Sequence, residues 1–113
     1  MGDSLTAAFG SDACTLEELV TEYRGRSWPV GGDDTIDDIS TLPNIIKKFS
    51  PNLKGYSTGI SACDSEEAAF NTAISGAISE DMTKMTIEMI RRMKAHAEVD
   101  FEADWKVVSI FIG

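Results

Sequence analysis

The chain has 113 residues, of which 42% are hydrophobic and 26% are charged, which is the composition of one ordinary globular domain and excludes a disordered or fibrous protein. Its 10 Lys and Arg residues against 19 Asp and Glu residues give a net charge of −9, with no basic cluster that would suit nucleic acid or an anionic membrane surface. No apolar run reaches the roughly 18 residues of a membrane-spanning helix, and the N-terminus does not resemble a signal peptide.

Two helices are expected in the first half of the chain. Thr15 and Glu18 have the spacing of a capping box, and Gly25 ends the helix that follows. Thr41, followed by an early proline, predicts a second helix that stops before Pro51. The apolar positions are Leu16, Leu19, Val20 and Tyr23 in the first helix, and Leu42, Ile45, Ile46 and Phe49 in the second.

Three shorter extended pieces are expected between and after these helices. Residues 27–34 read as an extended piece and a turn, and residues 55–60 as a short strand or a loop. Residues 70–74 read as a weak strand that runs into Ser75-Gly76.

The clearest helix is expected from Asp81 to about His96. An acidic residue at its start and Arg91, Arg92 and Lys94 near its end suit the helix dipole. One apolar side is formed by Met82, Met85, Met89 and Met93. We interpret these methionines as packing surface and not as sulfur ligands.

The last expected element is a strand over Trp105–Ile112. Its nearly continuous β-branched run is typical of a strand buried on both faces in a parallel sheet. Gly113 follows it, at the position where ligand-binding residues lie in α/β sheets. The alternation of strands and helices predicts an α/β sandwich, and its end at a strand–loop junction suggests part of a larger domain.

Ser4 and Gly76 are the candidate site residues. A serine at a sharp turn before a helix would have its own N–H available to an oxyanion, although Asp3 and Ser4 could equally cap that helix. A glycine after a strand can present its N–H at the sheet edge, or can be an ordinary turn glycine. His96 is rejected as a general base, because it lies at the far end of its helix among solvated residues.

Two smaller groups of residues are also open to a chemical interpretation. The acidic cluster Asp33, Asp34, Asp37 and Asp38 lacks the ligand spacing of a calcium loop, so a solvated loop is favoured over a divalent-ion site. The cysteines Cys14 and Cys63 are favoured as two separate thiols over one internal disulfide.

Taken together, these pieces resemble the GDSL, or SGNH, hydrolase family. Gly2-Asp3-Ser4-Leu5 resembles its first block, Ala73-Ile74-Ser75-Gly76 its second, and Ile110-Phe111-Ile112-Gly113 the strand that leads into its third, Gly-x-Asn-Asp. The stretches that resemble the phospholipase B branch are Tyr23-Arg24-Gly25-Arg26-Ser27-Trp28 with Gly31-Gly32-Asp33, Thr41-Leu42-Pro43-Asn44-Ile45, Phe49-x-Pro51-x-Leu53-x-Gly55 and Asp104-Trp105-Lys106.

This resemblance implies a three-layer α/β/α sandwich with a parallel, flavodoxin-like sheet. It implies that Ser4 is the nucleophile, that the N–H groups of Ser4 and Gly76 form part of an oxyanion hole, and that Gly2 and Asp3 support the nucleophile loop. The implied substrates are phospholipids, lysophospholipids and other lipid esters such as retinyl esters, cleaved without a metal or cofactor. The implied location is the secretory pathway and the outer face of the plasma membrane, where each cysteine could enter a disulfide.

The sequence also departs from the family pattern. The first strand, the oxyanion Asn and the catalytic Asp-x-x-His pair fall outside these residues, and Ala77 stands where many relatives carry Asp. We therefore expect 1–113 to be a partial hydrolase domain that is neither active nor stably folded by itself. The alternative functions are an esterase for small acyl or acetyl esters, a non-catalytic flavodoxin-like module that binds phosphate, and an acidic interaction domain.

Overall fold

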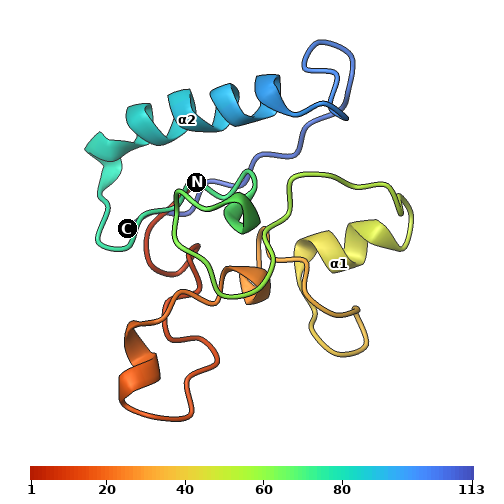
Figure 1. Ribbon diagram of the computed structural model, residues 1–113. Coiled ribbons are helices and arrows are strands. Elements are labelled where there is room, and N and C mark those ends of the chain that lie inside the picture. Colours follow the sequence, from red (N-terminus) through yellow and green to blue (C-terminus); the bar gives the residue numbers. More distant parts are fainter.

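The computed structural model describes all 113 residues (Figure 1). It contains two α-helices, α1 (Leu42–Lys47) and α2 (Met82–Ala95), joined by long irregular segments. Four short 3₁₀ turns lie among these segments: η1 (Glu17–Val20), η2 (Arg24–Arg26), η3 (Glu66–Ala68) and η4 (Ser79–Asp81). No helix is both long and apolar enough to cross a membrane.

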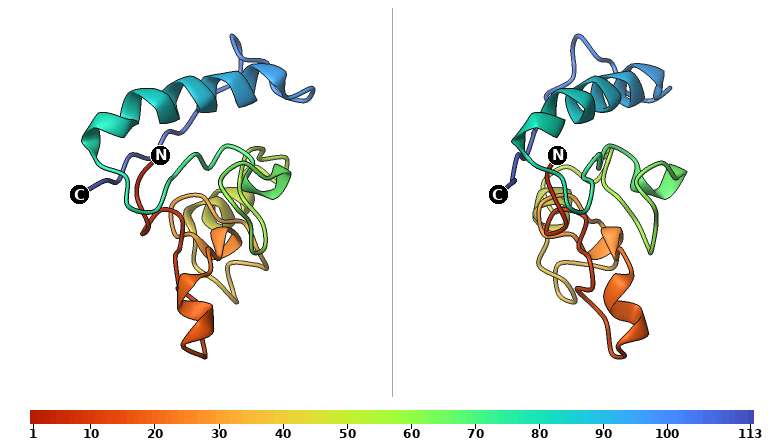
Figure 2. Two further views of the ribbon diagram at one scale, coloured as in Figure 1. Left: turned by 60° about the vertical axis from the view of Figure 1, so that its left-hand side comes forward. Right: turned by 90° about the vertical axis from the view of Figure 1, so that its left-hand side faces the viewer.

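Chain segments pair at isolated β-bridges instead of forming regular strands. Gly2 pairs in parallel with Phe111, Phe9 pairs antiparallel with Glu22, and Gly31 pairs in parallel with Ser57. The N–H of Ile74 also donates to the carbonyl of Gly2, over 3.1 Å. The N-terminal segment therefore lies between residue 74 and the C-terminal segment, and both ends of the chain lie beneath α2 (Figures 1 and 2).

The prediction of a final strand buried on both faces is wrong for this chain. Trp105 is 100% exposed, Val107 71% and Ile110 60%, and only one bridge forms in the whole segment. The physical reason is that few neighbours cover this segment. Its backbone is hydrogen-bonded along one edge only, to the segment that begins at Met1. Without a second neighbour and a second covering layer, the β-branched side chains stay in contact with solvent.

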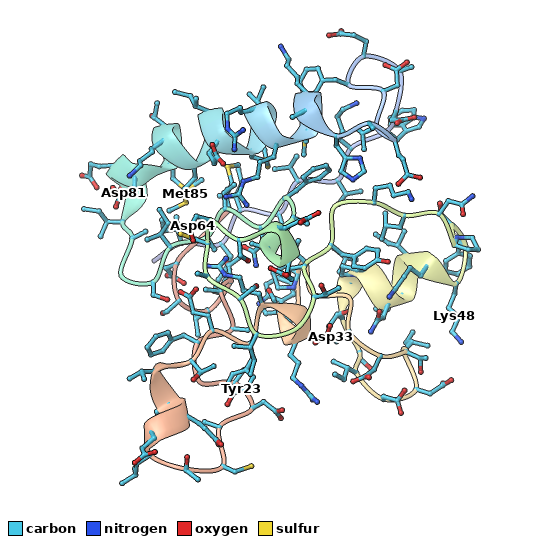
Figure 3. The ribbon with its side chains drawn as sticks, viewed as in Figure 1. Tyr23, Asp33, Lys48, Asp64, Asp81 and Met85 are labelled. Atoms are coloured by element: carbon cyan, nitrogen blue, oxygen red, sulfur yellow. The ribbon has the colours of Figure 1, made fainter.

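The core lies under α2, as the methionine pattern predicts. Met85, Met89 and Met93 are buried and form one cluster with Met1 and Ala77. Partly buried side chains packed on this cluster are Phe70, Ile74, Met82, Phe101 and Ile112. Figure 3 shows Met85 extending from α2 toward the rest of the molecule. The methionines are thus packing surface, and they hold α2 over the paired terminal segments.

Helix α1 begins where the sequence predicts and ends earlier. The Thr41 hydroxyl accepts a hydrogen bond from the N–H of Asn44 over 3.2 Å, and Pro43 lies in the first turn. The helix stops at Lys47, so Phe49 is not part of its apolar face and is 86% exposed. The prediction of a start at Thr41 is confirmed, whereas the predicted apolar stripe is wrong at its end.

The helix predicted after Thr15 shrinks to the single turn η1. The Glu18 carboxylate does accept from the N–H of Thr15, at 3.1 Å, so the capping contact forms. The helix stops because the chain then pairs with an earlier segment, at Phe9 and Glu22, which requires extended backbone. Residues 9–22, the projecting hairpin, extend away from α2 (Figures 1 and 2), and the side chains Leu16, Leu19 and Val20 remain exposed.

Candidate active site

The first block forms a tight turn that leaves Ser4 partly exposed. The N–H of Ala7 donates to the carbonyl of Asp3 and the N–H of Phe9 to the carbonyl of Ser4, each over 3.0 Å. One Asp3 carboxylate oxygen accepts from the N–H of Leu5 at 2.9 Å. The helix expected after Ser4 does not form, because these bonds close irregular turns. The backbone N–H and the hydroxyl of Ser4 donate no hydrogen bond within the protein.

Gly2 stands where no side chain fits. A Cβ at this position would overlap the carbonyl oxygen of Phe111 and the hydroxyl of Thr6. That hydroxyl in turn donates to the Phe111 carbonyl over 3.2 Å. Gly2 therefore permits the close approach of the first and last segments directly before the serine.

The second block ends in a turn that presents Gly76. The N–H of Ala77 donates to the carbonyl of Ile74 over 3.0 Å, and Gly76 has φ +81°, the conformation of the third residue of a type II turn. The N–H of Gly76 has no partner in the protein, and a Cβ built on Gly76 would meet nothing within 4 Å. This N–H therefore belongs to an open part of the surface and is free to bind a ligand.

The residues of all three blocks come together at one edge. The Gly2 carbonyl accepts from the N–H of Ile74 at 3.1 Å, and the Met1 carbonyl accepts from the N–H of Phe111 at 3.2 Å. The second carboxylate oxygen of Asp3 accepts from the N–H of Gly113 at 3.2 Å. The segments that lead to the serine, to the second-block glycine and to the third-block glycine thus lie side by side, with the serine's segment in the middle.

Asn71 ties the first block to the second. Its side-chain amide donates to the carbonyl of Thr6 over 3.2 Å, and its amide oxygen accepts from the N–H of Ala73 at the same distance. The hydroxyl of Ser27 donates to the same Thr6 carbonyl over 2.7 Å. All four residues are buried, so these bonds are protected from competition with water.

The structural role of Arg24 was not predicted from the sequence. Its side chain is completely buried and donates to the carbonyls of Ser61 (3.0 Å), Asn71 (3.2 Å) and Ala73 (2.8 Å). Glu22 forms its ion pair, at 2.7 Å. The spacing of Glu22 and Arg24 could have predicted this ion pair, because residues two apart in extended backbone lie on the same side of the chain.

The other residues that the sequence singled out lie away from this edge. His96 directly follows α2, whose 14 residues span about 21 Å, and the helix begins on the side of Gly76. Its ring packs edge-on against Phe70, with ring centroids 5.6 Å apart. His96 is thus at the opposite end of the helix from the second-block turn and has no contact with Ser4.

The acidic cluster forms a loop on the surface. Both carboxylate oxygens of Asp33 accept from the N–H of Gly59, at 2.9 and 3.1 Å, while Asp34, Asp37 and Asp38 are exposed. No group of three or more His, Cys, Asp or Glu side chains is arranged to hold a metal ion. The cysteines Cys14 and Cys63 are free thiols.

Comparison with known proteins shows a family relationship over the whole chain. Residues 1–113 match the family described as GDSL-like lipase/acylhydrolase. The chain is 44% identical over 115 residues to "Phospholipase B1, membrane-associated" of Mus musculus, and 42% and 39% identical to the proteins of that name in Rattus norvegicus and Homo sapiens. Each alignment covers 100% of this chain and 8% of the relative, so the chain spans a small part of those proteins. No solved structure matches.

The family match extends over the whole chain, residues 1–113. The family implies an α/β fold, whereas the structure shows two helices and isolated bridges without a regular strand. The chain therefore belongs to the GDSL-like lipase/acylhydrolase family.

Proposed function

We propose that the complete polypeptide that carries these 113 residues hydrolyses acyl esters of lipids, of the phospholipid or lysophospholipid class, with Ser4 as the nucleophile. The observation that supports this most directly is the pair of unpartnered N–H groups, on Ser4 and Gly76, at the ends of neighbouring segments. Free N–H groups at such a position can stabilise the negative charge that develops on an ester oxygen. The names of the relatives support a phospholipid substrate.

The proposed reaction is acyl transfer through a covalent intermediate. The Ser4 hydroxyl oxygen attacks the ester carbonyl carbon, and its proton passes to a general base. The carbonyl oxygen becomes an oxyanion held by the N–H groups of Ser4 and Gly76. The alcohol portion leaves with a proton, and water then releases the fatty acid from the serine. Asp3 does not react in this scheme; its two hydrogen bonds, to the N–H of Leu5 and of Gly113, hold the serine's turn.

The general base comes from another part of the polypeptide in this proposal. His96, the one histidine of these residues, is held against Phe70 at the far end of α2. The resemblance to the family supports an Asp-x-x-His pair as base and an Asn after Gly113 as a third oxyanion donor. We accordingly propose that residues 1–113 alone do not turn over an ester, because a serine without its base keeps its proton at neutral pH.

We further propose that the complete domain is a three-layer α/β/α sandwich in which more polypeptide covers residues 105–112. The exposed side chains of Trp105, Val107 and Ile110 support this, because they leave apolar groups uncovered on both sides of an extended segment. Neither a metal nor a cofactor enters the proposed reaction. The relatives' names support contact with a membrane. We propose that this contact is made through other regions of the protein, on the secretory pathway and at the outer face of the plasma membrane.

The experiment uses the complete polypeptide, its Ser4→Ala variant and the control variant Ser11→Ala. Ser11 is an exposed serine of the projecting hairpin, so its hydroxyl should not matter. We expect release of fatty acid from lysophosphatidylcholine by the wild type and by Ser11→Ala, and a loss of at least about 10³-fold in Ser4→Ala. A fluorophosphonate probe should label Ser4 in the wild type and in Ser11→Ala, and should not label the Ser4→Ala variant.

Two other outcomes would change the assignment. Rapid cleavage of p-nitrophenyl acetate without cleavage of the lipid would assign the site to small esters. Full lipid hydrolysis by Ser4→Ala would remove Ser4 as the nucleophile.

A further inference from the structure

The turn that presents Gly76 is held by a carboxylate from a distant part of the chain. The Ser75 hydroxyl donates to one carboxylate oxygen of Glu22 over 2.7 Å. The other oxygen of Glu22 accepts from two nitrogens of the Arg24 guanidinium, at 2.7 and 3.1 Å. Ser75 is therefore joined through Glu22 to the buried arginine.

Arg24 makes this connection rigid. Its guanidinium is permanently charged and completely buried, so it needs both a counter-charge and acceptors for its N–H groups. Glu22 supplies the counter-charge, and the carbonyls of Asn71 and Ala73 are two of the acceptors. Arg24 thus immobilises the segment that leads into the turn, while Glu22 holds the turn itself.

Glu22 also lies on the segment that pairs with the continuation of the nucleophile turn. It forms the antiparallel bridge with Phe9, and next to it the N–H of Tyr23 donates to the carbonyl of Ala8 over 3.1 Å. On the other side, the N–H of Gly10 donates to the carbonyl of Thr21 over 2.7 Å. The backbone around Glu22 is consequently fixed to the residues that follow Ser4, and its side chain is fixed to Ser75.

The orientation of the Gly76 N–H depends on this link. That N–H belongs to the same peptide plane as the carbonyl of Ser75, so a rotation of Ser75 rotates the N–H. A Cβ built on Gly76 would meet nothing within 4 Å, so no neighbouring group packs against that side of the glycine. Beyond the turn's own bond from Ala77 to Ile74, the hydroxyl of Ser75 is the group that anchors this peptide plane.

We propose that Glu22 is a positioning residue of the active site: by accepting the Ser75 hydroxyl while paired with Arg24, it sets the direction of the Gly76 N–H relative to Ser4. This inference rests on the proposed function, because it assumes that the N–H of Gly76 stabilises an oxyanion. Loss of one complete oxyanion donor costs about 10²–10³-fold in kcat. A donor that is present but misdirected should lower kcat by less, on the order of tenfold.

The test measures kcat and KM for lysophosphatidylcholine, together with thermal unfolding, on variants of the complete polypeptide. Ser75→Ala removes the hydroxyl, and Ser75→Thr keeps it. Glu22→Asp keeps the charge but shortens the side chain by one methylene group, which withdraws the carboxylate from Ser75 and also lengthens its contact with Arg24. The matched control is Thr72→Val, which removes a buried hydroxyl of the same segment that has no hydrogen-bond partner.

We expect Ser75→Ala and Glu22→Asp each to lower kcat about tenfold with KM unchanged, and Ser75→Ala to keep the unfolding midpoint of the wild type. Glu22→Asp should also lower the midpoint, because it weakens the buried pair with Arg24. Ser75→Thr and Thr72→Val should keep the wild-type kcat. The double variant Glu22→Asp/Ser75→Ala should lose no more than either single variant, because both remove the same link. A purely structural role would instead lower the unfolding midpoint and leave kcat unchanged in the folded fraction.

Three results would overturn the inference. The first is a Ser75→Ala enzyme with the kcat of Thr72→Val, and the second is additive losses in the double variant. In both cases an active wild type and an inactive Ser4→Ala variant would leave the proposed function standing. The third is a wild type that neither hydrolyses the lipid nor reacts with a fluorophosphonate at Ser4, which overturns the proposed function and this inference with it.

Discussion

The two sides of the molecule are held together by different forces. The helix side, formed by α2 and the side chains packed beneath it, depends on apolar contacts of Met85, Met89 and Met93 and on ion pairs within one helix. The site side, formed by residues 2–9, 21–27 and 71–77, depends on buried polar side chains that bond to distant backbone. The Asn71 amide and the Thr6 carbonyl, for example, are 65 residues apart in the sequence.

This difference has a consequence for the candidate site. Apolar packing tolerates small shifts, since the contacts have no direction. Hydrogen bonds at 2.7–3.2 Å do have direction, so the buried polar side chains of the site side fix angles as well as positions. A site that must aim N–H groups at one oxygen atom is better supported by the second kind of contact. Substitutions on the two sides should therefore have effects on stability and on kcat that differ in size and in kind.

The largest effect is expected from Arg24→Met, which keeps the length of the side chain and removes its charge. The change leaves Glu22 without its ion-pair partner and three carbonyls without a donor. It should lower the free energy of unfolding by about 3–5 kcal/mol. Amide hydrogen exchange of residues 69–77 in the complete polypeptide measures this. The control is Arg91→Met on the exposed face of α2, where protection should change far less. Equal effects of the two variants would contradict the contrast between the sides.

Met85→Ala tests the helix side. Met85 is almost completely buried in the methionine cluster, and its truncation leaves a cavity that should cost about 3 kcal/mol. Amide hydrogen exchange should accelerate throughout α2, whereas the esterase kcat of the folded protein should stay at the wild-type value. Ile87→Ala, at an exposed position of the same helix, is the control and should leave protection nearly unchanged. A large loss of kcat at unchanged protection would show that the two sides are coupled.

Thr41→Ala should have a smaller effect. It removes the hydroxyl that accepts from the N–H of Asn44 at the start of α1, a loss of about 1 kcal/mol. Thr41→Ser should restore most of the protection of α1 in hydrogen exchange, and Ser40→Ala, at the exposed neighbouring position, serves as control. If Thr41→Ser behaves like Thr41→Ala, the methyl group of Thr41 and not its hydroxyl holds the start of the helix.

The sequence predicted the two helices well. The start of α1 and both ends of α2 follow from local patterns, namely a cap, a proline and methionines three and four residues apart. These signals act within one or two turns, so no knowledge of the rest of the chain is needed. The same local reasoning failed for η1 and for residues 105–112, where pairing and coverage by distant segments decide the outcome.

The site side was predicted only as far as the family resemblance reached. The blocks identified Ser4 and Gly76, and the structure brings their segments together through the bond from Ile74 to Gly2. The bonds that fix the geometry, such as Ser75 to Glu22 and Arg24 to Ala73, join residues 53 and 49 positions apart. No periodicity or local spacing encodes a contact over such separations, because it arises from the path of the whole chain.

The smallest effect is expected from Glu88→Gln on α2, and it should depend on pH. Hydrogen bonds from Arg91 and Arg92 lower the pKa of Glu88 from 4.5 to about 2. Above about pH 5 the carboxylate is charged in the folded and the unfolded chain, so the full contribution of these pairs is present. As the pH falls from about 4.5 toward 2, the unfolded chain takes up a proton before the folded one does, and the contribution is lost.

The wild type should therefore protect α2 more than Glu88→Gln does at neutral pH, and the gap should close as the pH approaches 2. Hydrogen exchange, corrected for the intrinsic pH dependence of the exchange reaction, measures this gap. High salt should narrow it as well, because the arginine on the exposed side is in contact with solvent. A gap that persists at low pH would contradict this account, because Glu88→Gln keeps the methylene groups of the side chain and removes only its charge, so the difference between the two proteins should vanish once Glu88 is protonated.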